Sequence, residues 1–174
     1  MKFGVDQTTE MLRQTPATLS SMLGGLSPAW TRSRNDRKDW SPYDIVGHLI
    51  QAEETNWVPR AEIILSRGKD RRFPLFDRVG YFHRTKGRPL PDLLKEFSKQ
   101  RKASIKKIAS WQLTSKELAL TGVHPEFGKV TLRQLLATWT VHDLGHIRQI
   151  VTYLANEHAD NVGPWKEYLS ILRK

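Results

Sequence analysis

The sequence predicts an all-α fold: a four-helix bundle with a long crossover between the second and third helices and a short C-terminal helix. Apolar residues recur at steps of three and four along four long segments, the pattern of helices that bury one face. Residues 68–89 lie between the second and third segments and show no sustained period. A bundle in which one connection is long, rather than a short hairpin, accounts for both observations.

The first predicted helix covers residues 5–24, with Leu12 and Leu19 on its apolar stripe. Pro16 lacks the backbone N–H that a helix interior requires, so we expect either a kink there or a second segment capped by Thr15. A glycine pair directly after the last apolar residues ends the helix.

The second predicted helix follows a connecting loop over residues 27–40. Ser41 and Asp44 form a capping box around a proline at the first helical position, which is a strong helix start. The apolar pattern then continues to about Arg67. Pro59 removes one backbone hydrogen bond from this helix, so we expect a bend near it.

The crossover at residues 68–89 is rich in charged and aromatic side chains. Long connections inside compact domains are often functional. We therefore expect Phe73, Phe76, Tyr81 and Phe82 to pack against the bundle or to line the mouth of a pocket.

The third predicted helix covers residues 91–111, and Arg101 lies on its apolar face between Phe97 and Ile105. A guanidinium in a protein interior needs a partner. We therefore predict an acidic side chain or an anion-binding cavity within its reach. The alternative is that the aliphatic stem packs and the charged head reaches solvent.

The fourth helix is the longest, and it is predicted to begin at Thr131, which forms a capping box with Gln134, and to end near residue 157. A capping box at Thr114 and Glu117 predicts a short helical turn before it. Residues 124–129 are expected to form a turn.

A short amphipathic helix over residues 165–172 is expected to complete the chain.

Composition sets limits on the class of protein. The 174 residues are enough for one domain, taken as residues 1–174, and there are no cysteines, so disulfides and thiolate metal sites are excluded. The sequence shows no signal peptide and no apolar run of membrane-spanning length, so a cytoplasmic protein is expected and a membrane is not. The net charge of +10 invites a nucleic-acid hypothesis. No nucleic-acid-binding motif accompanies the charge, so nucleic acid is not the expected partner.

Two histidines lie four residues apart on the apolar face of the fourth helix. His142 and His146 share that face with Trp139 and Ile150, and this spacing places the two imidazoles side by side. The spacing suits one metal ion. It is equally compatible with two core histidines that hydrogen-bond to their neighbours.

Three stretches of the chain together resemble a known family. They are Trp40-Ser-Pro-x-Asp-Ile-Val-Gly-His48-Leu-Ile-x-Ala-Glu, His-Pro-Glu-Phe-Gly-x-Val-Thr-Leu-Arg-Gln-Leu-Leu, and His142-Asp-x-x-His146-x-x-Gln149-Ile. Over about residues 5–157 the chain resembles the DinB-like superfamily. The resemblance implies a four-helix bundle that holds one divalent metal ion through His48, His142 and His146. His83, His124 and His158 have no place in that motif.

Three histidine ligands without a fourth protein ligand leave a coordination position open, as in catalytic rather than structural sites. Imidazole suits several divalent ions, and zinc or nickel is the expected cofactor. Ligating rings usually donate their other N–H to an acceptor, for which Asp44, Asp143 and Gln149 are candidates. No general base and no other catalytic residue can be named, because Glu53 and Glu54 lie away from the His48 stripe.

The family implies a metal-dependent enzyme, either a thiol-dependent transferase or a hydrolase, that acts on a small molecule. A low-molecular-weight thiol and a homodimer are the partners that this hypothesis implies. The alternative is a non-catalytic, metal-stabilised binding or stress-response protein that uses its basic surface. Positive charge gathered around the metal would favour a small anionic substrate, whereas charge spread over the third helix would favour a surface partner or solubility alone.

Overall fold

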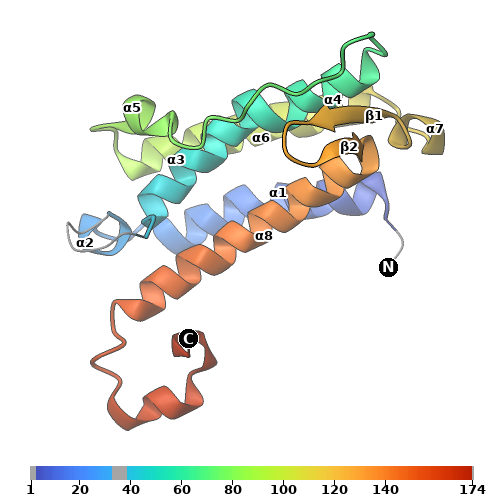
Figure 1. Cartoon of the computed structure of the whole chain (residues 1–174). Helices are drawn as coiled ribbons and strands as arrows, with labels where there is room; N and C mark the ends of the chain where they lie inside the picture. Colours follow the sequence, from blue (N-terminus) through green and yellow to red (C-terminus); the bar gives the residue numbers. More distant parts are fainter. Residues whose placement is uncertain (1–2, 33–38, 174) are drawn as a thin grey trace.

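The computed structural model describes residues 3–32 and 39–173, and it confirms the predicted four-helix bundle (Figure 1). Part of the loop expected over residues 27–40 therefore lies outside the described residues. The long helices are α1 (Val5–Leu23), α3 (Pro42–Ala52) with its continuation α4 (Val58–Leu65), α6 (Leu90–Ser110) and α8 (Leu132–Asn156). The shorter helices are α2 (Pro28–Thr31), α5 (Tyr81–Thr85) in the crossover and α7 (Ser115–Leu118).

The capping boxes begin the helices where the sequence places them. Ser41 accepts from the backbone of Asp44, Thr131 accepts from that of Gln134, and Thr114 caps α7. In each case the third helical residue returns a bond to the backbone of the capping residue. These local bonds satisfy donors that a helix start leaves free, which is why short sequence signals locate the starts well.

The second long helix is interrupted where the sequence predicts a bend. A π-helical turn, η1 (Glu53–Trp57), joins α3 to α4, whose second residue is Pro59. A π turn rotates less per residue than an α turn and so changes which side chains share a face. Pro16, by contrast, lies inside a single continuous helix, so no second segment begins there.

The fold is not purely helical, and the turn expected at residues 124–129 is part of a β-hairpin. Strands β1 (Thr121–His124) and β2 (Gly128–Thr131) pair antiparallel, and Gly128 adopts the left-handed conformation with φ 68°. The crossover continues this small sheet, because Phe73 N donates to Val123 O over 2.9 Å. A Cβ on Gly122 would lie 2.4 Å from the Phe73 ring, so only glycine permits this contact.

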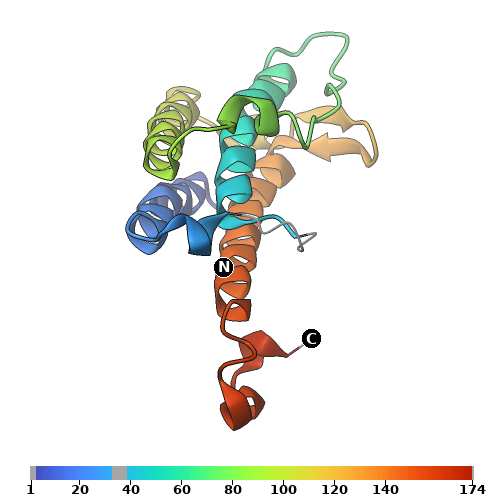
Figure 2. The same ribbon diagram turned by 90° about the vertical axis from the view of Figure 1, so that its left-hand side faces the viewer.

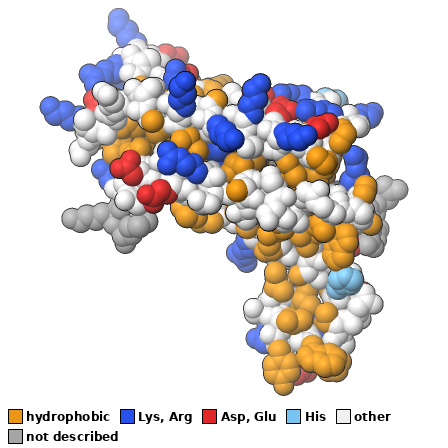
Figure 3. Space-filling model, turned by 180° about the vertical axis from the view of Figure 1, so that it is seen from behind, with side chains coloured by type: hydrophobic (Ala, Val, Ile, Leu, Met, Phe, Trp, Pro, Cys, Tyr) orange, Lys and Arg blue, Asp and Glu red, His pale blue; other side chains and the backbone are white. Residues whose placement is uncertain are grey.

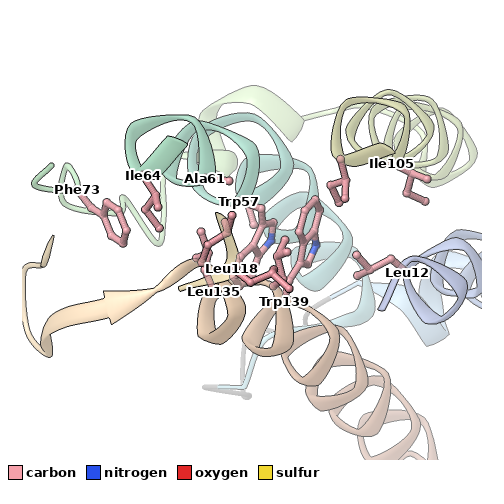
Figure 4. Close-up of a cluster of buried hydrophobic side chains, with 13 residues drawn as sticks. Leu12, Trp57, Ala61, Ile64, Phe73, Ile105, Leu118, Leu135 and Trp139 are labelled. Atoms are coloured by element: carbon pink, nitrogen blue, oxygen red, sulfur yellow. The ribbon is translucent and has the colours of Figure 1, made fainter. Parts of the chain in front are cut away.

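The core lies between the long helices as two clusters of buried apolar side chains. Figure 4 shows the cluster near the hairpin, in which Trp57 and Trp139 stack with ring centroids 5.5 Å apart. The other cluster joins α1, α3 and α6 around Leu19, Ile45 and Phe97. Both clusters contain residues from the second long helix, so α3 and α4 hold the bundle together along its length.

The short C-terminal helix expected over residues 165–172 is present, but it is of the 3₁₀ rather than the α type. After α8 the chain forms two 3₁₀ turns, η2 (Gly163–Tyr168) and η3 (Ser170–Leu172), in a segment that extends beyond the bundle (Figures 1 and 2). We call residues 157–173 the C-terminal arm. Within the described residues, no helix is long and apolar enough to cross a membrane.

Candidate metal centre

The structure brings three of the six histidines together at one point between two helices. His48 comes from α3, and His142 and His146 come from successive turns of α8. The Nε2 atom of His142 lies 3.2 Å from that of His48 and 3.1 Å from that of His146. Among the residues described, these three side chains form the group whose donor atoms all lie within 4.8 Å of one another.

This donor set fits a divalent ion. Two imidazole nitrogens that share a tetrahedral zinc at about 2.0–2.1 Å lie about 3.3 Å apart, close to the spacings found here. Three neutral rings that aim their Nε2 atoms at one point also concentrate lone pairs there, and a cation relieves that repulsion. Three histidines and no further histidine or carboxylate make up the group in the described part of the chain, so an ion held here would keep room for a further ligand.

Burial keeps His48 and His146 in the neutral form that a metal requires. It lowers the pKa of His48 to about 3, and the neighbouring rings of His146 and His142 contribute to the same shift. Burial also lowers the pKa of His146 to about 4, assisted by His142. Near neutral pH both rings are therefore free of the extra proton that would compete with an ion.

The three candidate acceptors for these rings lie in different environments. The Nδ1 atom of His146 lies 3.0 Å from Gln149 Oε1, a contact that orients the ring. Asp143 Oδ1 is 4.0 Å from His142 Nδ1, which is too long for a hydrogen bond but places a negative charge beside the ring. Asp44 instead accepts from the backbone and side chain of Ser41.

Asp143 also joins the buried partner network of Arg101. The Arg101 side chain is 1% exposed and donates to Asp143 Oδ2 over 2.6 Å and to Glu53 Oε1 over 2.9 Å. The acidic partner expected for Arg101 is therefore confirmed, and a solvent-reaching head is wrong. Burial raises the pKa of Asp143, but His142 and Arg101 together hold it below its usual range.

A pocket of about 350 Å³ opens over the three histidines. Its sides are the crossover, the tip of the hairpin and the π turn, and besides the histidines it is lined by Trp40, Asn56, Arg60, Leu75, Phe76, Arg78, His124, Pro125 and Glu126. We call it the histidine pocket. Phe76 lines its mouth as expected, whereas Phe73 and Tyr81 are buried in the structure and Phe82 is exposed.

Several pocket residues were not identified from the sequence. Asn56 and Arg60 look like ordinary polar positions of an α-helix, because the π turn that brings them to the pocket has no sequence signature. Arg78 and His124 lie in a loop and a hairpin without a period. His124 lies in the pocket lining but outside the three-histidine group, while His83 and His158 are exposed.

Comparisons with known proteins agree with this architecture. A family model described as the DinB superfamily matches residues 11–150. Among solved structures, YfiT from Bacillus subtilis is similar with a TM-score of 0.75 and 15% identity, over 93% of this chain and 91% of that one. That protein is described as a probable metal-dependent hydrolase with an unusual four-helix bundle topology, and at this identity the likeness shows the fold alone. No curated protein matches this chain.

Proposed function

This chain belongs to the DinB superfamily, and on that premise we propose that it is a metal-dependent enzyme whose ion is held by His48, His142 and His146. The observation that carries the proposal is the convergence of the three Nε2 atoms beneath a pocket of about 350 Å³. A pocket of this volume suits a small-molecule substrate. An exposed or tightly enclosed histidine cluster would not support this conclusion.

Zinc or nickel is the ion we propose, and when bound it supplies Lewis-acid activation of a nucleophile or of a substrate oxygen. The chain itself positions the site. Gln149 holds the ring of His146, and Trp40 lies against His48 with ring centroids 4.9 Å apart. Phe76 packs edge-on against His48 at 5.6 Å, so two aromatic rings limit the access of water to that ligand.

The nucleophile would be either water, in a hydrolase, or a low-molecular-weight thiol, in a transferase. The description of YfiT favours hydrolysis as the first activity to assay. Two arginines, Arg60 and Arg78, line the same pocket, so an anionic substrate is favoured over a cationic one.

Metal content of the purified protein tests the proposal. We expect about one divalent ion per chain by elemental analysis, lost in the double variant His142→Ala, His146→Ala. The double variant His83→Ala, His158→Ala removes two exposed histidines and should keep the ion. Full metal content in the first variant would overturn the proposal. A screen of ester, amide and thiol-acceptor substrates on the metal-loaded protein would then define the reaction.

A second candidate function is supported by the surface of α6. Lys95, Lys99, Lys102 and Lys106 line grooves between α1 and α6, and Figure 3 shows Lys and Arg side chains spread over one face of the molecule. Such a surface could bind a polyanion without catalysis. Binding of a duplex DNA probe that weakens steeply between 50 and 200 mM salt, and that persists in the metal-free protein, would favour this function over the enzyme.

A further inference from the structure

Among the described residues, two arginine side chains are buried, and carboxylates of those residues neutralise one of them. Arg101 is 1% exposed and contacts Glu53 and Asp143, whereas Arg60 is 6% exposed and makes no ion pair with any carboxylate among the described residues. Moving a charged group into a protein interior is costly unless the charge is paired. Arg60 therefore has an electrostatic requirement that the described residues do not meet.

The contacts of Arg60 hold its position without compensating its charge. One terminal nitrogen donates to the carbonyl oxygen of Pro74 over 3.2 Å, and the guanidinium lies 5.1 Å from the centre of the Phe73 ring. Its Nε is buried and has no hydrogen-bond partner in the part of the chain that the structure describes. The guanidinium is thus fixed at the side of the histidine pocket with a donor still unused.

The π turn explains why Arg60 faces this pocket. Arg60 follows His48 by 12 positions, and in a regular α-helix the two side chains would point about 120° apart. The wider turn at Glu53–Trp57 rotates less per residue and brings Arg60 back toward the face of His48. Asn56, one turn before Arg60, also lines the pocket, and its Oδ1 is buried without a partner from residues 3–32 or 39–173.

His124 presents a second donor to the same space. Its Nδ1 accepts the backbone N–H groups of Glu126 and Phe127, over 3.1 and 3.3 Å, so the proton of the neutral ring lies on Nε2. Both Arg60 and His124 line the histidine pocket, and they approach it from different elements, α4 and β1. A guanidinium and an imidazole N–H are donors suited to an anion.

We propose that Arg60, assisted by His124, is a carboxylate-binding subsite that holds one end of the substrate while its reacting end lies at the three histidines. The inference rests on the function proposed above. A planar carboxylate matches the fork of a guanidinium and requires only one compensating charge. Glu126 lines the same pocket. Its carboxylate would repel a doubly charged phosphate more strongly than a singly charged carboxylate.

Bifunctional probes test this subsite on the zinc-loaded protein. Each probe carries a hydroxamate, which binds zinc, at one end and either a carboxylate or an uncharged amide of the same length at the other, with two to four methylene groups between. We expect the wild type to bind the best carboxylate probe about tenfold or more tightly than its amide counterpart. The ratio should fall toward one in Arg60→Gln, while the amide probe binds unchanged.

Two further variants keep the test decisive. Arg60→Lys retains the charge but not the fork and should keep only part of the preference, which gives a result even if Arg60→Gln folds poorly. Arg72→Gln removes an exposed arginine of the crossover that does not line this pocket and should keep the preference. No carboxylate preference in the wild type, a preference retained in Arg60→Gln, or a stronger preference for a phosphonate-ended probe would overturn the proposal.

Failure of the metal site gives a different result. If the three histidines hold no ion, neither hydroxamate will bind, whatever its other end. The subsite is then tested on metal-free protein by the chemical shifts that glutarate and uncharged glutaramide induce in the Arg60 side-chain N–H signal. A shift with glutarate alone would support the subsite without the metal, and equal or absent shifts would overturn it.

Discussion

At the scale of single residues, Arg101 shows what a charge inside this bundle requires. Its guanidinium contacts carboxylates from η1 and α8 and the carbonyl oxygen of Leu12 in α1. Replacing it with methionine keeps the packed stem but leaves Glu53 and Asp143 buried without their counter-charge. We expect Arg101→Met to lower the free energy of unfolding by about 3–5 kcal/mol in urea denaturation.

A surface pair provides the control for that measurement. Arg84 pairs with Glu54, but its side chain is 43% exposed. Arg84→Met should therefore change stability by no more than about 1 kcal/mol. A near-neutral Arg101→Met would mean that the buried network contributes little, contrary to its geometry.

The pocket histidines make the stability of the metal-free protein depend on pH. Burial lowers the pKa of His48 to about 3 and that of His146 to about 4, whereas both titrate near 6.5 in the unfolded chain. The unfolded state thus binds protons first as pH falls, so the contribution of these two rings to stability should be complete above about pH 7 and decrease from about pH 6.5 toward 4. Urea titrations at pH 7.5, 6 and 5 measure this slope.

His48→Asn should reduce the slope, while His83→Ala, at an exposed position, should leave it unchanged. Equal stability of the metal-free wild type at pH 7.5 and 5 would contradict the assignment of neutral, buried rings. The occupancy of the metal site should also decrease as pH falls, because protons and the metal ion compete for the imidazole nitrogens.

Some of these residues could be predicted from the sequence and others could not. The H-x-x-x-H spacing placed His142 and His146 on one face, because an α-helix fixes neighbours four apart. Periodicity did not predict the burial of His48, which lies on the flank of its apolar face but is 5% exposed. Arg60 was missed because its direction depends on a π turn that the surrounding packing stabilises rather than on local sequence.

At the scale of elements, the close packing of α3 against α5 depends on a glycine in α3. A Cβ on Gly47 would lie 2.6 Å from Tyr81 Cδ2 and 3.0 Å from Thr85 Cγ2. We expect Gly47→Ala to destabilise the protein by about 1–3 kcal/mol, since α5 must shift or its side chains must leave their rotamers. Thermal unfolding followed by circular dichroism measures this change.

Gly145 is the matched control, because it also lies inside a long helix but a Cβ there meets no atom of the described residues within 4 Å. Gly145→Ala should stabilise the protein by about 0.5–1 kcal/mol through helix propensity alone. The same sign for both variants would show that close packing of α5 does not depend on Gly47.

Elements with local signals were predicted well, and those that depend on tertiary contacts were not. The capping boxes at Ser41 and Thr131 located two helix starts. The hairpin was missed because its strands have four residues each, too few for an alternating pattern to stand out. Its pairing also depends on the distant crossover, which hydrogen-bonds to Val123.

At the scale of the whole molecule, the C-terminal arm exposes an unusual share of apolar surface. Trp165 is 70% exposed and Tyr168 82% exposed, with Leu169 and Ile171 beside them. Contiguous apolar surface of this kind often marks an interface. We therefore predict that the chain forms a homodimer through the arm, with a mass of two chains by light scattering. The double variant Trp165→Ser, Tyr168→Ser should be monomeric.

The control for this prediction replaces Phe127, which is 75% exposed at the hairpin tip and distant from the arm in sequence. Phe127→Ser should leave the mass unchanged. A monomeric wild type, or a dimer in the arm variant, would exclude the arm as the interface.

Two of the three walls of the histidine pocket, the crossover and the hairpin, are bonded to each other. Phe73 N donates to Val123 O, and Val123 N donates to Arg71 O, so the crossover and the hairpin share one small sheet. Neither wall can swing aside alone without breaking both bonds. Admission of a substrate wider than the mouth must therefore displace the two walls as one unit, and the amide protons of Phe73 and Val123 would exchange with solvent at a common rate.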